Sequence, residues 1–213
     1  PKNIELCNNH IKKYRANNVK LFPLALSDKT GETTFFVSSG QPDIAKDETE
    51  WDYGNKSSSL LPPAKTKDVH KWLKFNEEIK VKTERLDKFI ETQKIKEVDF
   101  LYMDVQGAEL LVLEGAGKIL IDVKAIWLEV EAVELYKDQP LRKDIEIFMK
   151  NAGFSCVMDT VDNVSGDQLY VSQAVIDKVE KQKQDNPAEY FSKVSALLNY
   201  INSIWNKNEL SDS

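Results

Sequence analysis

The segment from Val98 to Gly117, VDFLYMDVQGAELLVLEGAG, decides the fold class of this chain. It begins with a short, apolar, β-rich run that ends at Met103, as expected for a buried parallel strand. The run stops at an acid, Asp104, after which Gly107 allows a tight turn. Leucines at helical spacing follow until glycines interrupt the pattern. Strand, acid, turn and helix make half of a βαβ unit. Ligands of open α/β sheets bind at the carboxyl ends of such strands, so Asp104 is a candidate site residue.

Composition limits the classes of protein to consider. The 213 residues are 41% hydrophobic and 30% charged, which is enough to bury a core. A formal net charge of −6 argues against nucleic acid as a partner. No run approaches the ~18 apolar residues of a membrane span. Cys7 and Cys156 form neither a disulfide framework nor a metal-ligand pattern, so a reducing compartment and a cytoplasmic location are expected.

The segments on either side of the central motif also read as strands. Residues 19–26 and 32–37 are predicted to form a hairpin over the turn at 27–31, although Pro23 interrupts the first strand. Residues 125–130, AIWLEV, read as the next buried strand, and residues 154–158 and 168–171 read as two closing strands. Glu129 and Glu131 stand at the end of the strand at 125–130, so one of them is expected to face a bound acceptor.

Residues 38–63 form a long stretch without helical or strand periodicity, as is typical of a functional loop or lid. Trp51 and Tyr53 are bulky for a solvated loop, and they either pack onto the domain or line a pocket. The two histidines, His10 and His70, are expected to be solvated.

The chain is expected to comprise an α/β domain over residues 1–173 and a helical extension over residues 174–213. Pro187 begins the second helix of this extension, and an apolar stripe follows over residues 187–205. The stripe either packs onto the domain or contacts a partner or a second copy of the chain.

The motif DFLYMDVQGAELLVLEGAGKIL resembles the FkbM-type methyltransferases, in which a strand is followed by D-V-E-G-A-E and a helix. Further matches are LALSDKTGETTFF, VKTERLDKFI and AIWLEVE, in the family's order over about the first four-fifths of the chain. The resemblance implies the class I methyltransferase fold, a doubly wound, mostly parallel sheet with antiparallel closing strands. It also implies S-adenosylmethionine as cofactor. The expected reaction is methyl transfer to a hydroxyl of a carbohydrate acceptor, such as a sugar or glycan, or of a small-molecule metabolite.

The expected site residues fall into three groups. The catalytic candidates, which would orient or deprotonate the acceptor hydroxyl, are Asp104, Glu129 and Glu131. The cofactor-binding candidates implied by the resemblance are Ala25, Leu26, Asp104, Val105 and Gln106. The acceptor-binding candidates are Trp51, Tyr53, Ser58 and Ser59. Asp104 could alternatively hold a divalent cation, and Glu109 could simply complement the helix dipole.

Two departures from the family pattern stand out. The glycine-rich D-x-G-A-N-x-G turn and the following ribose-binding acid do not occur in these residues, so the fold is expected to be N-terminally incomplete and to bind S-adenosylmethionine poorly. Gln106 stands where the family usually has Glu, and Gln106→Glu is therefore expected to keep or raise methyl transfer.

Two further classes remain open. The first is a non-catalytic α/β module that keeps the fold without the cofactor. The second is a receiver-like phospho-acceptor domain. Glu129 argues against the receiver, which would need a lysine at the end of that strand.

Overall fold

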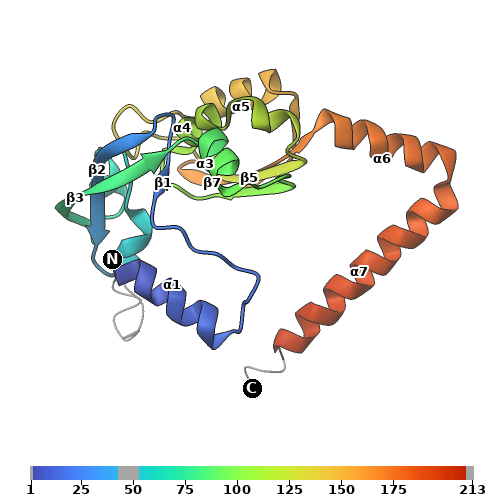
Figure 1. The fold of residues 1–213 in the computed structure, drawn as a ribbon, viewed down its shortest axis with the longest axis horizontal. Helices are drawn as coiled ribbons and strands as arrows, with labels where there is room; N and C mark the ends of the chain where they lie inside the picture. Colours follow the sequence, from blue (N-terminus) through green and yellow to red (C-terminus); the bar gives the residue numbers. More distant parts are fainter. Residues whose placement is uncertain (1, 43–52, 210–213) are drawn as a thin grey trace.

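The computed structural model describes residues 2–42 and 53–209, which form two small sheets surrounded by helices (Figure 1). The larger sheet has the strand order β4-β5-β7-β6. Its strands span Phe100–Met103, Ala125–Glu131, Ser165–Ser172 and Phe154–Asp159, respectively. The smaller sheet has the order β1-β3-β2, with strands Ala25–Leu26, Lys74–Glu84 and Gly31–Ser39.

The fold is α/β, as the sequence indicates, but its sheets are mixed rather than mostly parallel. Among the strands of residues 2–42 and 53–209, β4 with β5 and β1 with β3 pair in parallel, while the β2–β3, β5–β7 and β6–β7 pairs are antiparallel. The prediction of antiparallel closing strands, β6 and β7, is confirmed. The strands are divided between two sheets, so the expected mostly parallel sheet is corrected to two mixed ones.

The main core lies between the larger sheet and the helices on one of its faces. Ile126, Leu128 and Val130 alternate along β5 and are buried, as strand periodicity requires. They belong to one apolar cluster with residues of α4 (Glu109–Ala116), the 3-10 helix η3 (Gly117–Ile121) and α5 (Arg142–Asn151). Helix α3 (Leu86–Gln93) contributes Leu86 to the same cluster. These contacts fix the ends of β4 and β5, where the candidate site lies.

Strand β4 is less buried than the sequence predicts. Its side chains Phe100 and Tyr102 are 50% and 67% exposed. Among the described residues, β4 pairs only with β5 and is therefore an edge strand. An edge position leaves one side of the strand, and part of its apolar surface, in contact with solvent.

The predicted hairpin over residues 27–31 is wrong. Strands β1 and β2 do not pair with each other, because β3 lies between them and pairs with both. The central position of β3 reflects its eleven residues, which are long enough to pair with β2 along its whole length. The strand order of this sheet is therefore set by pairing with β3 and not by the local turn at residues 27–31.

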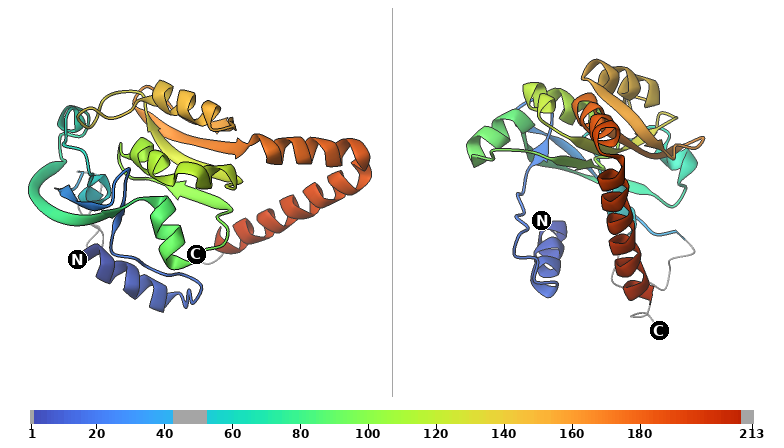
Figure 2. Two further views of the ribbon diagram at one scale, coloured as in Figure 1. Left: turned by 45° about the horizontal axis from the view of Figure 1, so that its top comes forward. Right: turned by 90° about the vertical axis from the view of Figure 1, so that its right-hand side faces the viewer.

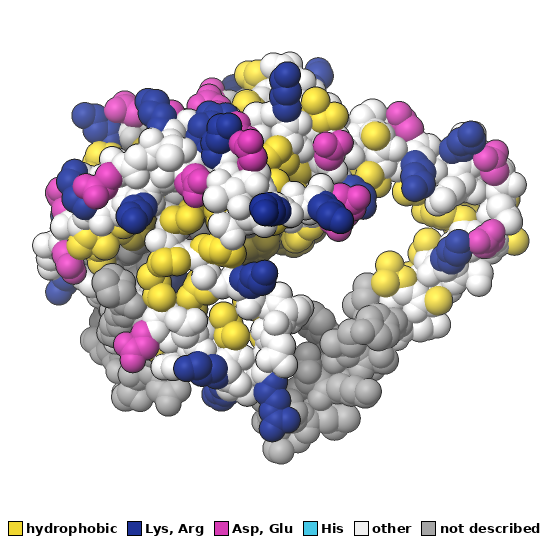
Figure 3. All heavy atoms as spheres, viewed as in Figure 1, with side chains coloured by type: hydrophobic (Ala, Val, Ile, Leu, Met, Phe, Trp, Pro, Cys, Tyr) yellow, Lys and Arg dark blue, Asp and Glu magenta, His cyan; other side chains and the backbone are white. Residues whose placement is uncertain are grey.

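Three longer helices lie at the periphery: α1 (Lys2–Lys13), α6 (Gln173–Asp185) and α7 (Pro187–Glu209). Figure 2 shows that α6 continues from β7 away from the sheet and that α7 then turns back without lying against it. Phe191, Leu197 and Leu198 of α7 are more than half exposed, and Figure 3 shows hydrophobic side chains at the surface along this helix. None of the helices within residues 2–42 and 53–209 has the length and apolarity needed to cross a membrane.

Candidate active site

The turn after β4 brings its polar side chains to the carboxyl end of the sheet. Gln106 and Gly107 have positive φ angles of 54° and 88°, so two consecutive left-handed residues reverse the chain before α4 begins. Glycine adopts this conformation freely, but glutamine does so only at a cost. Because β4 and β5 are parallel, the residues after β4 lie beside the end of β5.

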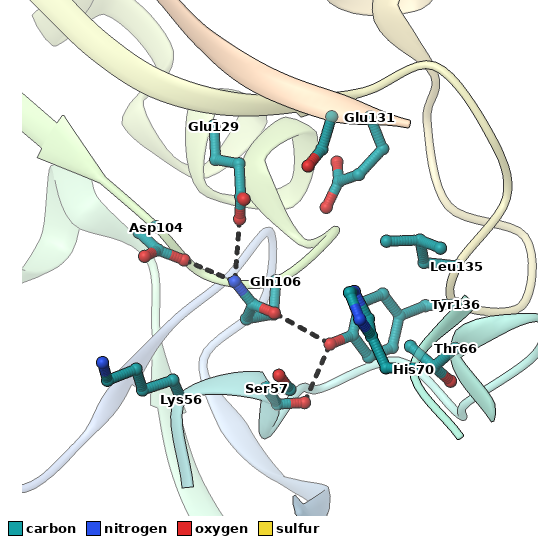
Figure 4. A pocket seen from close by; sticks show the side chains of 11 residues that line it. Lys56, Ser57, Thr66, His70, Asp104, Gln106, Glu129, Glu131, Leu135 and Tyr136 are labelled. Carbon is teal, nitrogen blue, oxygen red and sulfur yellow. Dashed lines mark hydrogen bonds between the residues drawn. The ribbon is translucent and has the colours of Figure 1, made fainter. Parts of the chain in front are cut away.

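Gln106 links the two acids that end these neighbouring strands. Its side-chain Nε2 donates hydrogen bonds of 2.7 Å to Asp104 Oδ1 and of 2.7 Å to Glu129 Oε2 (Figure 4). The amide thus lies between a carboxyl group of the turn and one of β5. A single side chain satisfies one oxygen of each acid.

Tyr136 closes the other side of the Gln106 amide. Its hydroxyl lies 2.9 Å from Gln106 Oε1 and 2.8 Å from the carbonyl oxygen of Ser57, and it can donate its one proton to either acceptor (Figure 4). The Tyr136 side chain is buried, and its burial raises the pKa of the phenol. Tyr136 therefore remains a neutral hydrogen-bond donor at physiological pH.

These groups line a pocket of about 240 Å³. Its walls come from the 3-10 helix η2 (Tyr53–Ser57), the short helix α2 (Thr66–Val69), the turn after β4, the end of β5 and the start of β7. The lining residues are Lys56, Ser57, Thr66, His70, Asp104, Gln106, Glu129, Glu131, Leu135, Tyr136 and Ser165. The pocket thus combines three carboxyl groups with hydroxyl, amide and imidazole groups.

Burial favours the protonated form of these acids. It raises the pKa of Glu129 to about 8, with the neighbouring charge of Asp104 as the next cause. It raises the pKa of Glu131 to about 9, with the charges of Glu109 and Glu129 adding to the effect. The cause in each case is the cost of placing a negative charge away from water and beside other negative charges. Near neutral pH, Glu129 and Glu131 therefore carry protons, while Asp104 has an exposed carboxyl group.

Glu109 is a structural neighbour of the pocket rather than one of its lining residues. It is 2% exposed, and its Oε1 accepts a 2.9 Å hydrogen bond from the backbone N–H of Val105. Burial raises its pKa to about 7, which the hydrogen bond from Val105 partly offsets. Glu109 thus holds the turn against the start of α4, in addition to lying where it complements the helix dipole.

The three catalytic candidates, Asp104, Glu129 and Glu131, all line one pocket. Of the cofactor-binding candidates, Asp104 and Gln106 line it, whereas Val105 donates its N–H to Glu109. Ala25 and Leu26 pair with Thr83 and Glu84 in the smaller sheet and are not among the lining residues. The geometry therefore brings together the acids but not the whole expected cofactor set.

Of the acceptor-binding candidates, Ser58 and Ser59 are not among the residues that line the pocket. Ser59 is fully buried and donates a 2.7 Å hydrogen bond to the Gln106 carbonyl, while Ser58 Oγ accepts one of 3.0 Å from the Ser38 N–H. Both serines thus support the loop, and Ser57 is the one of the run that lines the pocket. Trp51 lies outside the described residues, as does the side chain of Tyr53.

Sequence reasoning missed Tyr136, Thr66 and His70. The expectation that His70 is solvated is wrong, because His70 is only partly exposed and lines the pocket. Tyr136 follows a single apolar residue, Leu135, in a polar segment, which is a weak signal for burial. None of these residues lies next to a recognisable motif, so their position in the pocket lining is visible only in the folded chain.

Within the part of the chain that the structure describes, no three or more His, Cys, Asp or Glu side chains are arranged to hold a metal ion. The amide of Gln106 lies between two of the carboxyl groups that such an ion would use.

An α/β fold with acids at the carboxyl ends of adjacent parallel strands defines a ligand-binding domain of the open-sheet class. The model of the methyltransferase FkbM domain matches residues 2–156. The chain therefore belongs to the FkbM methyltransferase family, and the resemblance seen in the central motif is confirmed.

The chain is also similar to the 2-O-methyltransferase NoeI of Sinorhizobium fredii. The two are 34% identical over 154 residues, which make up 72% of this chain and 59% of NoeI. The chain thus aligns with less than two thirds of that relative's length. No solved structure was found to match it.

Proposed function

We propose that this chain is the S-adenosylmethionine-dependent methyl-transfer domain of an O-methyltransferase that acts on a hydroxyl of a sugar, glycan or small metabolite. The observation that carries the proposal is the meeting of Asp104, Gln106 and Glu129 in one pocket at the ends of β4 and β5. Membership of the FkbM family supports methyl transfer, and the name of the relative NoeI records transfer to an oxygen.

The charge of the pocket suits one end of the cofactor. S-adenosylmethionine would supply a methyl group that is electrophilic because it is bound to a positively charged sulfur. Asp104, whose carboxyl is exposed in the pocket, could contact the positively charged sulfur of a bound cofactor. The volume of about 240 Å³ is below the ~300–1,000 Å³ typical of whole small-molecule sites, so the fit covers only part of the ligand.

Within the proposal, the acids have different roles. The acceptor hydroxyl must be aligned and must lose its proton as its oxygen takes the methyl group. Asp104 is the proposed base, because its carboxyl is the exposed one and only one of its oxygens receives the Gln106 hydrogen bond. Glu129 and Glu131 have raised pKa values and would act as protonated groups that orient the acceptor. Environments that separate the pKa values of neighbouring acids commonly divide such roles.

The experiment is a transfer assay with S-adenosylmethionine that carries a tritiated methyl group. Monosaccharides and oligosaccharides serve as acceptors, and the labelled position is identified by NMR spectroscopy. We expect label on an ether oxygen and its loss in Asp104→Asn. Label on a nitrogen, or equal transfer by Asp104→Asn, would contradict the proposal.

Calorimetric titration with S-adenosylmethionine distinguishes the methyltransferase from the competing class, a non-catalytic α/β module. We expect weak binding, with a dissociation constant above the micromolar value that corresponds to about −8 kcal/mol. Absence of both binding and transfer at millimolar cofactor would favour the non-catalytic α/β module instead.

A further inference from the structure

Gln106 has a backbone conformation that its side chain alone would not favour. Its φ of 54° lies in the left-handed region, which is strained for a residue other than glycine. Ser59, which is fully buried, donates a 2.7 Å hydrogen bond to the Gln106 carbonyl and holds this conformation. Glycine would fit the turn at lower cost. The side chain must therefore supply something that the backbone does not, because observed strain of this kind concentrates at functional sites.

The side-chain amide uses both its donating and its accepting atoms within the site. Nε2 donates to Asp104 and Glu129, each at 2.7 Å, and Oε1 accepts from the Tyr136 hydroxyl at 2.9 Å. The opposite amide orientation would place Oε1 against two carboxyl groups and Nε2 against a hydroxyl that has another acceptor in Ser57. The observed orientation therefore keeps an N–H donor, rather than an oxygen, against the exposed Asp104 carboxyl.

No ion pair between described residues includes Asp104 or Glu129. The described ion pairs lie elsewhere, for example between Arg85 and Asp87 and between Arg142 and Glu146. Gln106 is thus the residue that supplies N–H donors to this pair of acids from within the described chain. An uncharged amide here performs the bridging that a cation would otherwise perform.

We propose that Gln106 is a positioning residue, whose amide takes the place of a cation between Asp104 and Glu129 and holds both carboxyl groups at the pocket. The role in catalysis rests on the proposed function, whereas the bridging itself does not. Position 106 then determines whether the two acids are held by an amide or need a bound cation. This reverses the expectation from the family pattern, because glutamate at 106 would add a third carboxyl group and remove both donors.

The first test follows the titration of Glu129 by NMR spectroscopy of protein labelled with ¹³C at the glutamate and aspartate carboxyl carbons. The other titratable groups that face Glu129 or line the same pocket are Asp104, Glu109, Glu131, Tyr136, Asp167 and His70. Lys56 also lines the pocket. The carboxyl signals of Asp104, Glu109, Glu131 and Asp167 are followed in the same spectra.

We expect Gln106→Met to raise the titration midpoint of Glu129 by about one pH unit, because the ionised form loses an N–H donor. Gln139→Met is the matched control, since Gln139 is a buried neighbouring glutamine that accepts from the Tyr136 N–H and has no hydrogen bond to the acids. It should leave the midpoint unchanged. An unchanged midpoint in Gln106→Met, or an equal rise in Gln139→Met, would overturn the proposal.

The second test is calorimetric titration with MnCl₂, which needs neither cofactor nor acceptor. We expect Gln106→Glu to gain one Mn²⁺ site that disappears again in Gln106→Glu/Glu129→Gln, while the natural chain shows no such site. A site in the natural chain that is lost in Glu129→Gln, or no gain in Gln106→Glu, would overturn the proposal. Both tests are independent of methyl transfer, so a failure here is distinguishable from a failure of the proposed function. If Gln106→Met does not fold, the Mn²⁺ titrations of Gln106→Glu and Gln106→Glu/Glu129→Gln still test the proposal.

Discussion

Asp104 lines the pocket with an exposed carboxyl, which under the proposed function faces the acceptor hydroxyl. It follows β4 directly, and one of its oxygens accepts the Gln106 hydrogen bond. The Asp104 carboxyl is therefore held by a hydrogen bond from Gln106 and is still exposed to solvent.

We expect Asp104→Asn to reduce turnover by roughly 10²–10⁴-fold, the usual contribution of positioned proton transfer. Stability should change by no more than about 0.5 kcal/mol, because an exposed side chain is replaced and asparagine keeps an oxygen for Gln106. Tritiated methyl transfer and thermal unfolding measure the two effects. Asp122→Asn, an exposed acid that follows η3, is the control and should change neither. A loss of folding with normal activity in the surviving folded fraction would make Asp104 a structural turn residue.

Strand β5 places two acids on one side of the sheet because Glu129 and Glu131 are two residues apart. Both pKa values are raised above the ordinary value of 4.5, so the folded protein keeps protons that the unfolded chain releases. The unfolded state then binds fewer protons, and the free energy of unfolding falls as pH rises. The window runs from about 4.5 to about 9 for Glu131.

We therefore expect a lower melting temperature at pH 9 than at pH 6. Glu131→Gln should raise the melting temperature at pH 9 and flatten its pH dependence, because glutamine stays uncharged throughout. Glu114→Gln, an exposed position on α4, is the control and should leave the slope unchanged. A melting temperature of Glu131→Gln that falls with pH as steeply as in the natural chain would contradict the burial of a protonated acid here.

Helix α4 approaches the turn after β1 so closely that only glycine fits at position 115. A Cβ there would collide with the backbone carbonyl oxygen of Ser27. In an exposed helix, Gly→Ala stabilises by about 1 kcal/mol. Gly115→Ala should instead destabilise the protein by about 1–3 kcal/mol, as overpacking does. Urea unfolding measures the sign, and Glu114→Ala on the exposed side of the same helix should change stability little. A stabilised Gly115→Ala would show that the two sheets can move apart at this contact.

At the scale of the whole molecule, the pocket depends on segments that belong to different sheets. The turn after β4 contacts the segment that follows β2 through Ser59, and the carbonyl of Ser57 in the same segment lies within hydrogen-bond distance of the Tyr136 hydroxyl. Among the described residues, helix α7 contributes none of those that line the pocket, and Figure 2 shows that it turns back from the end of α6 without lying against the larger sheet. The expectation that residues 187–205 contact a partner or a second copy stays a prediction.

Deletion of residues 186–213 should leave the urea unfolding midpoint of the remaining chain unchanged. The apolar side chains Phe191, Leu197 and Leu198 are exposed, so their removal uncovers little of the core. Deletion from residue 173 onward is the comparison, and it should destabilise the chain because Gln173 donates its N–H to the Gly153 carbonyl. Equal losses in both deletions would show that α7 stabilises the α/β body. Sedimentation of the natural chain and of the shorter deletion tests the expected partner contact.

Local sequence determined the α/β class, the β4–turn–α4 unit, the position of Asp104 at the end of β4 and membership of the FkbM family. Each of these depends on residues that are neighbours along the chain, such as an apolar run, an acid and a glycine turn. The place of the acids at the end of β5 could also be predicted, because parallel strands end at the same edge of a sheet.

Only the tertiary structure decided how the site is connected. Tyr136 reaches Gln106 and Ser57 across 30 and 79 residues, and Ser59 reaches Gln106 across 47. The position of β3 between β1 and β2 and the place of His70 in the pocket also arise from long-range contacts. Periodicity reports which face of an element is buried, but not which distant segment covers that face. For this reason the sequence predicted the acids of the site, while the amide and the hydroxyl that hold them became visible only in the folded chain.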